Sequence, residues 1–133
     1  MNVTKAAPAT ASLTTALRLD AALVAMAGLA LIIAASPLGR LLAFDAGFLR
    51  TAGLLLLPWA AFVGWSGMRV PPSRIAAWTV VTGNTLWVLA SLTALILRAI
   101  DPNVLGITFV LAQALVVAAL AGWQAVTMRG AAR

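Results

Sequence analysis

The side chains that could do chemistry in this chain are a few amides and acids, and the amides lie inside apolar runs. Asn84 stands near the middle of the third run, and Trp87 and Ser91 follow on the same helical face, three and seven residues later. Gln113 and Gln124 in the fourth run are eleven residues apart, about three turns of helix, and also share a face. Hydrocarbon offers an amide no hydrogen-bond partner, so we expect these faces to turn inward and bond to each other. The alternatives are coordination of a small polar or quinone-like ligand, and exposure to lipid or to an oligomer partner.

Asp20 is the acidic residue that lies within an apolar run. It follows Arg18 by two residues near the expected start of its helix, so an interfacial, solvated carboxylate is one interpretation. The other is a buried acid that couples proton movement, because ionisable residues inside a membrane often mark ion or proton pathways. In that interpretation Asp20, Asn84 and Gln113 form a transport site. The site lies beside Pro58, whose place inside the second run predicts a helix kink.

Residue types that are missing from the chain narrow its chemistry further. The sequence has no Cys, His or Tyr, and its three acidic residues are all Asp. Disulfides, Cys/His zinc sites, histidine haem ligation and the usual general base at neutral pH are therefore excluded. We expect a protein that is not an enzyme and that holds no metal and no cofactor.

Composition places the chain in a membrane. Of its 133 residues 63% are hydrophobic and 9% are charged, whereas soluble domains carry about 25% charged residues. The net charge of +6 is spread over termini and loops, as in membrane proteins, and not gathered on one face. It indicates contact with anionic lipid headgroups and no nucleic-acid partner.

The apolar runs predict an all-α membrane protein, an antiparallel four-transmembrane-helix bundle with short loops that forms one domain over residues 1–133. We expect Asp45 to cap the second helix, Ser73 the third, and Asp101 with Pro102 to start the fourth. Residues 37–48 read as a short interfacial turn. The expected helices are about 12–35, 47–68, 74–98 and 102–128, preceded by a mobile tail, 1–11.

Small residues form stripes on the expected helices. Gly28 lies on such a stripe in the first helix, Gly53 and Gly67 in the second, and Ala118 and Gly122 in the fourth. Because small residues let helix backbones approach closely in lipid, these stripes predict the faces that pack.

Basic residues predict the orientation of the spans. Six of the nine Lys and Arg residues fall in the termini and the second loop, and three fall on the opposite side. The bias favours both termini in the cytoplasm, because cytoplasmic loops carry an excess of Lys and Arg. The six are Lys5, Arg18, Arg69, Arg74, Arg129 and Arg133, and the three are Arg40, Arg50 and Arg98.

The chain resembles a group of small bacterial four-helix integral membrane proteins, generally labelled as hypothetical, in three stretches: RTAGLLLLPWA (50–60), NTLWVLAS (84–91) and FVLAQALVVAALAGWQ (109–124). The resemblance implies the four-helix fold and a bacterial inner membrane, and it implies no activity. The chain is also similar in size and helix count to small multidrug-resistance transporters. They place a glutamate deep in their first helix, where this chain offers only Asp20, and they use a tyrosine that this chain lacks.

Three functional hypotheses follow. The first is a non-enzymatic membrane protein that acts by packing, as a homo-oligomer or as an accessory subunit of a membrane complex. The second is a small transporter or channel that uses Asp20, Asn84 and Gln113. The third is a lipid- or quinone-binding membrane module.

Overall fold

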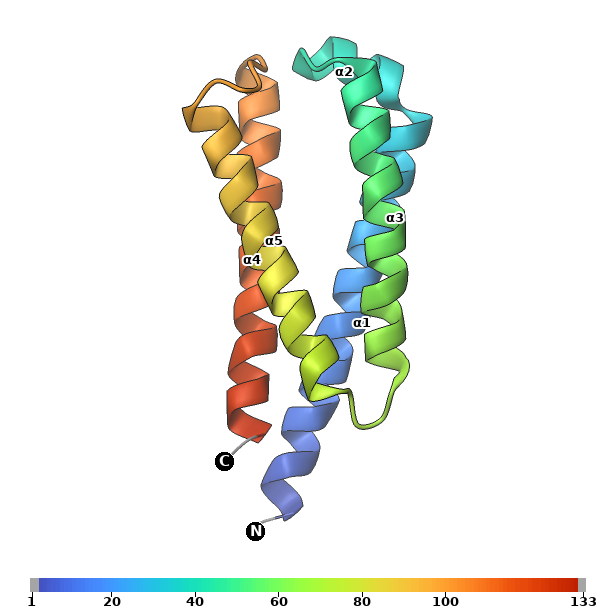
Figure 1. The fold of residues 1–133 in the computed structure, drawn as a ribbon, viewed down its shortest axis with the longest axis vertical. Coiled ribbons are helices and arrows are strands. Elements are labelled where there is room, and N and C mark those ends of the chain that lie inside the picture. Colours follow the sequence, from blue (N-terminus) through green and yellow to red (C-terminus); the bar gives the residue numbers. More distant parts are fainter. Residues whose placement is uncertain (1–2, 132–133) are drawn as a thin grey trace.

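The computed structural model describes residues 3–131, and in this part of the chain it contains five helices and no strand (Figure 1). Four of the helices are long and apolar enough to cross a membrane, which confirms the predicted all-α, four-span architecture. The helices are α1 (Val3–Ile33), α2 (Ala35–Leu42), α3 (Ala46–Met68), α4 (Arg74–Ile96) and α5 (Val104–Ala131).

Helix α1 begins much earlier than the sequence suggested. It starts at Val3, so the start expected at about residue 12 is wrong, and residues 1–2 lie outside the described part. The reason is local composition, because Ala6, Ala7, Ala9 and Ala11 are strong helix formers. The mobility of residues 1–11 stays a prediction.

A short helix, α2, replaces the interfacial turn predicted for residues 37–48. Its buried residues Ala35, Gly39 and Leu42 lie on one face, and Ala43 ends it in the left-handed conformation, with φ 59°. Pro37 falls in the first turn of α2, where the helix needs no backbone donor from it. Pro37 is therefore compatible with the start of α2.

Two of the predicted helix caps are confirmed. Asp45 Oδ2 accepts a hydrogen bond from the Phe48 backbone N–H at 2.9 Å at the start of α3. Ser73 Oγ accepts one from the Ala76 N–H at 3.4 Å at the start of α4. Both signals are local, so the sequence alone was sufficient to find them.

The predicted start of α5 at Asp101 and Pro102 is wrong. The helix begins at Val104, and Asn103 Oδ1 accepts the hydrogen bond from the Gly106 N–H at 2.9 Å. Asn103 also donates its side-chain N–H to Leu41 O at 2.8 Å and its backbone N–H to Leu42 O at 3.2 Å. These hydrogen bonds to the end of α2 hold Asn103 in place as the N-cap of α5, instead of Asp101.

The four spans form two helical hairpins. Helix α1 packs most extensively on α3, and α4 packs on α5, while the hairpins meet mainly through α1 and α5. Helices α3 and α4, although consecutive, touch little. Figure 1 shows both described chain ends at the same end of the molecule and the hairpins leaning apart above the α3–α4 loop.

Close backbone contact holds the α1–α3 hairpin together. A Cβ on Gly53 would lie 2.6 Å from Gly28 O, and a Cβ on Gly67 would lie 3.1 Å from Leu17 Cβ. Glycine is therefore required at position 53. The predicted packing stripe on the fourth span is wrong at Gly122, because nothing lies within 4 Å of a Cβ built there.

Candidate functional site: a buried polar cluster between the hairpins

Asp20 lies fully buried within α1, and the interfacial interpretation of this residue is wrong. In the apolar span Ala11–Ile33 it stands nine residues after the first residue and thirteen before the last. These separations correspond to about 13 Å and 20 Å along the helix axis. The carboxyl group is therefore far inside the bundle.

Side chains from all four spans form one hydrogen-bonded group that contains Asp20. Oδ2 of Asp20 accepts hydrogen bonds from Asn84 Nδ2 on α4 and from Gln124 Nε2 on α5, both at 2.7 Å. Asn84 Nδ2 also lies 3.4 Å from Gln124 Oε1. From α3, Trp59 Nε1 donates to Asn84 Oδ1 at 3.3 Å. These four residues are called the Asp20 cluster below.

The second carboxyl oxygen of Asp20 has no partner. Among the described residues, Oδ1 of Asp20 is the only buried side-chain nitrogen or oxygen without a hydrogen bond. The nearest basic residue in sequence, Arg18, donates instead to Gly67 O at 3.0 Å. A buried carboxyl group that lacks a cation must hold a proton or bind a polar partner, because an isolated charge at this depth is costly.

A glycine beside Asn84 positions the Trp59 indole. The ring of Trp59 occupies the place that a side chain at Gly83 would take, with the ring atom Cζ2 only 2.5 Å from a Cβ built there. Glycine at this position therefore allows the indole N–H to reach Asn84. Pro58 lies inside α3, directly before Trp59. The kink at Pro58 stays a prediction.

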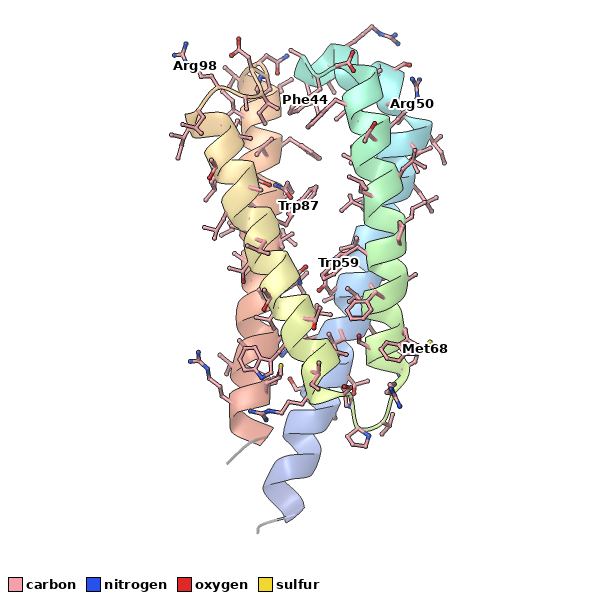
Figure 2. All side chains as sticks on the ribbon, viewed as in Figure 1. Phe44, Arg50, Trp59, Met68, Trp87 and Arg98 are labelled. Atoms are coloured by element: carbon pink, nitrogen blue, oxygen red, sulfur yellow. The ribbon has the colours of Figure 1, made fainter. Side chains whose placement is uncertain are left out.

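A second group of polar side chains lies farther along α4. Trp87 Nε1 donates to Gln113 Oε1 at 2.8 Å, and Gln113 Nε2 donates to Ser91 Oγ at 3.2 Å and to Val110 O at 2.9 Å. Trp87 is 36% exposed, so it does not fill the core as a buried residue does. Figure 2 shows Trp59 and Trp87 projecting from their helices toward the space between the hairpins. We call Trp87, Ser91 and Gln113 the Gln113 cluster.

The structure divides the residues singled out in the sequence between these two clusters. Asn84 and Gln124 join Asp20, whereas Gln113 bonds to Trp87 and Ser91 and takes no part in the Asp20 cluster. Sequence reasoning did not single out Trp59 as a site residue. It also did not identify Gly83. The sequence signal that could have indicated Gly83 is its position directly before Asn84, an amide inside an apolar run.

Comparison of the chain with protein-family models, with curated proteins and with solved structures finds no significant match. Within the described residues, no group of three or more His, Cys, Asp or Glu side chains is placed to hold a metal ion. The chemistry that the Asp20 cluster offers is proton exchange at Oδ1 and hydrogen bonding to polar groups.

Proposed function

We propose that this protein is a small, non-enzymatic membrane transport protein in which Asp20 couples proton movement to the arrangement of the two hairpins. The observation that carries the proposal is the buried, unpartnered Oδ1 of Asp20 at the point where the hairpins meet. Ionisable groups at such depth commonly serve as proton relays in transporters.

The proposed coupling has a direct physical basis. Oδ2 of Asp20 belongs to the α1–α3 hairpin, and both of its hydrogen-bond donors, Asn84 and Gln124, belong to the α4–α5 hairpin. Hydrogen bonds to an ionised acceptor are roughly twice as strong as neutral ones. Release of a proton from Asp20 therefore tightens the contact between the hairpins, and uptake of a proton loosens it.

The proposed membrane is the bacterial inner membrane, with both termini in the cytoplasm. The excess of Lys and Arg at the termini and in the second loop supports this orientation. In it, Asp20 lies closer to the cytoplasmic than to the outer end of α1's apolar span.

Asp20→Asn tests this function, because an Asn carbonyl can accept the same two amide hydrogen bonds but cannot release a proton. Everted membrane vesicles that contain the protein are energised and loaded with a dye sensitive to the pH gradient. Na⁺, K⁺ and ethidium are then added in turn. We expect at least one of these cations to collapse the gradient with the wild type and with Asp101→Asn, whose exposed carboxylate lies in a loop. Asp20→Asn abolishes the response.

Two results contradict the transport proposal. One is a wild-type protein that leaves the gradient unchanged with every probe. The other is an Asp20→Asn protein that responds as the wild type does. Size-exclusion chromatography of each variant shows whether it is folded and present in equal amount.

A second candidate function is packing, as a homo-oligomer or as a subunit of a membrane complex. The chain exposes 7924 Å². A compact soluble monomer of its 13.7 kDa mass exposes only about 6,600 Å². The partly exposed Gln113 cluster adds polar groups that a neighbouring helix can bond. Mass measurement in native nanodiscs tests this function, and a strict monomer without a copurifying protein contradicts it.

A further inference from the structure

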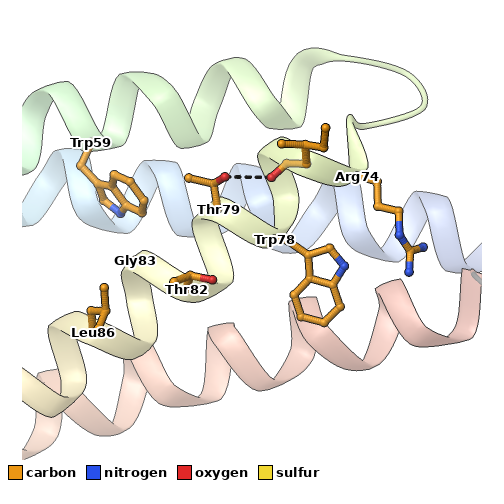
Figure 3. Close-up of a pocket in the computed structure, with 8 residues that line it drawn as sticks. Trp59, Arg74, Trp78, Thr79, Thr82, Gly83 and Leu86 are labelled. Carbon is orange, nitrogen blue, oxygen red and sulfur yellow. Dashed lines mark hydrogen bonds between the residues drawn. The ribbon is translucent and has the colours of Figure 1, made fainter.

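An open groove of about 570 Å³ runs along α4 on the side that is next to Trp59 of α3 (Figure 3). Arg74, the first residue of α4, lines one end, and Leu86 lines the other. Between them lie Trp78 and Thr82, and the Trp59 ring from α3 packs over Gly83. The groove is thus apolar along its length and basic at one end.

The length of the groove matches the depth of one membrane leaflet. Leu86 follows Arg74 by twelve residues, which is about 18 Å of helix axis. One leaflet contributes half of the hydrocarbon core of a bilayer, or about 15 Å. Trp78, one turn after Arg74, stands where indole rings are enriched at the membrane surface.

The positive charge of Arg74, at one end of the groove, is available to a ligand. Arg69 stacks on the Trp65 ring at 5.1 Å, and Arg18 donates to Gly67 O. Among the described residues, by contrast, no hydrogen bond or ion pair engages the Arg74 guanidinium, which lies exposed at the groove. Among the described residues, Arg18, Arg69 and Arg129 lie at the same end of the molecule. An anionic headgroup is the complement of this end of the groove.

We propose that the groove binds an anionic phospholipid of this leaflet, with the phosphate at Arg74 and one acyl chain lying along α4 as far as the Trp59 ring. This site shares only Trp59 with the Asp20 cluster, and the proposal does not depend on the transport function. Trp59 contacts the groove with its ring and donates its indole N–H to Asn84.

The headgroup is tested by native mass spectrometry of the full-length protein with phosphatidylglycerol and with phosphatidylcholine of the same acyl chains. We expect the wild type to retain phosphatidylglycerol preferentially. Arg74→Gln lowers that retention about fivefold, the effect of one Arg near an anionic surface. Arg69→Gln is the matched control, because Arg69 lies in the adjoining loop and does not line the groove. Equal losses in the two variants overturn the proposal, since they show only general attraction to negative charge.

The acyl chain is tested by filling the groove. Thr82→Phe places a ring in the groove without removing a hydrogen bond seen in the structure, and Thr108→Phe makes the same change at an exposed position on α5 outside it. We expect Thr82→Phe to lose retention of phosphatidylglycerol and Thr108→Phe to keep it. Unchanged retention in Thr82→Phe overturns the proposal. So does a dimer of the wild type that Thr82→Phe dissociates, because a second copy then occupies the groove.

Discussion

The two main contacts of the bundle differ in composition: the contact within the α1–α3 hairpin is close packing of two backbones, and the contact between the hairpins adds a hydrogen-bonded acid to an apolar core that includes Leu17, Val80 and Met128. Within the hairpin, Gly28 and Gly53 bring two backbones together with no polar side chain between them. Between the hairpins, Asn84 and Gln124 hold Asp20 through hydrogen bonds in the buried core. In lipid, where apolar burial gives helices little net attraction, close packing and interhelical hydrogen bonds are the two means of association.

The comparison shows which contact can respond to conditions. A glycine contact depends only on shape, so it is the same at any pH and tolerates no added atoms. The Asp20 contact depends on the proton content of one carboxyl group, and Oδ1 is still unpartnered. The α1–α3 hairpin is therefore expected to behave as a rigid unit, and the joint to the α4–α5 hairpin is expected to be adjustable.

Gly53→Leu breaks the rigid contact and is expected to have the largest effect. Its Cβ would lie 2.6 Å from Gly28 O, so the helices must separate. We expect a loss of about 3 kcal/mol in the free energy of unfolding, the upper part of the range for overpacking. Reversible unfolding in mixed micelles, followed by circular dichroism, measures it.

Gly122→Leu is the control for this variant, because nothing lies within 4 Å of a Cβ there. It is expected to leave stability unchanged or to raise it by up to about 1 kcal/mol through helix propensity. Equal losses in both variants would show that the α1–α3 contact is not specific.

Asp20→Leu breaks the polar contact and is expected to have an intermediate effect. It leaves the side-chain N–H donors of Asn84 and Gln124 without their acceptor, which costs about 1–2 kcal/mol. Asp20→Asn keeps a carbonyl acceptor and is expected to lose less than half as much in the same unfolding measurement. A loss with Asn as large as that with Leu would contradict the view that the two hydrogen bonds accepted at position 20 stabilise the fold.

Much of this fold was readable from the sequence because its signals are local. Four long apolar runs give four spans, and Asp45 and Ser73 cap their helices as their positions predict. The short helix α2 escaped prediction because its eight residues include Pro37 and Gly39, which are poor helix formers. Its contact with Asn103 also moved the start of α5 past Asp101.

The candidate site was less readable, because it depends on how helices cross. A shared face put Gln113 and Gln124 on one side of α5, but their eleven-residue separation is about 16 Å along the axis. Gln113 and Gln124 therefore cannot hydrogen-bond to the same side chain. Gln113 bonds to Trp87, and Gln124 bonds to Asp20. The burial of Asp20 was misjudged because it depends on Asn84 and Gln124, which adjoin Asp20 only once α4 and α5 have packed against α1.

Gln113→Leu tests whether the two clusters act separately, and it is expected to have the smallest effect. It removes the acceptor of Trp87 at a partly exposed position, a loss of about 0.6 kcal/mol. Combined with Asp20→Leu, its effect is expected to add within about 0.5 kcal/mol, because distant sites without shared partners are independent. Gln124→Leu with Asp20→Leu is expected not to add, since each change breaks the same hydrogen bond. A non-additive result for Gln113 would mean that the two clusters form one network along α4. Protonation of Asp20 would then also affect the hydrogen bonds of the Gln113 cluster.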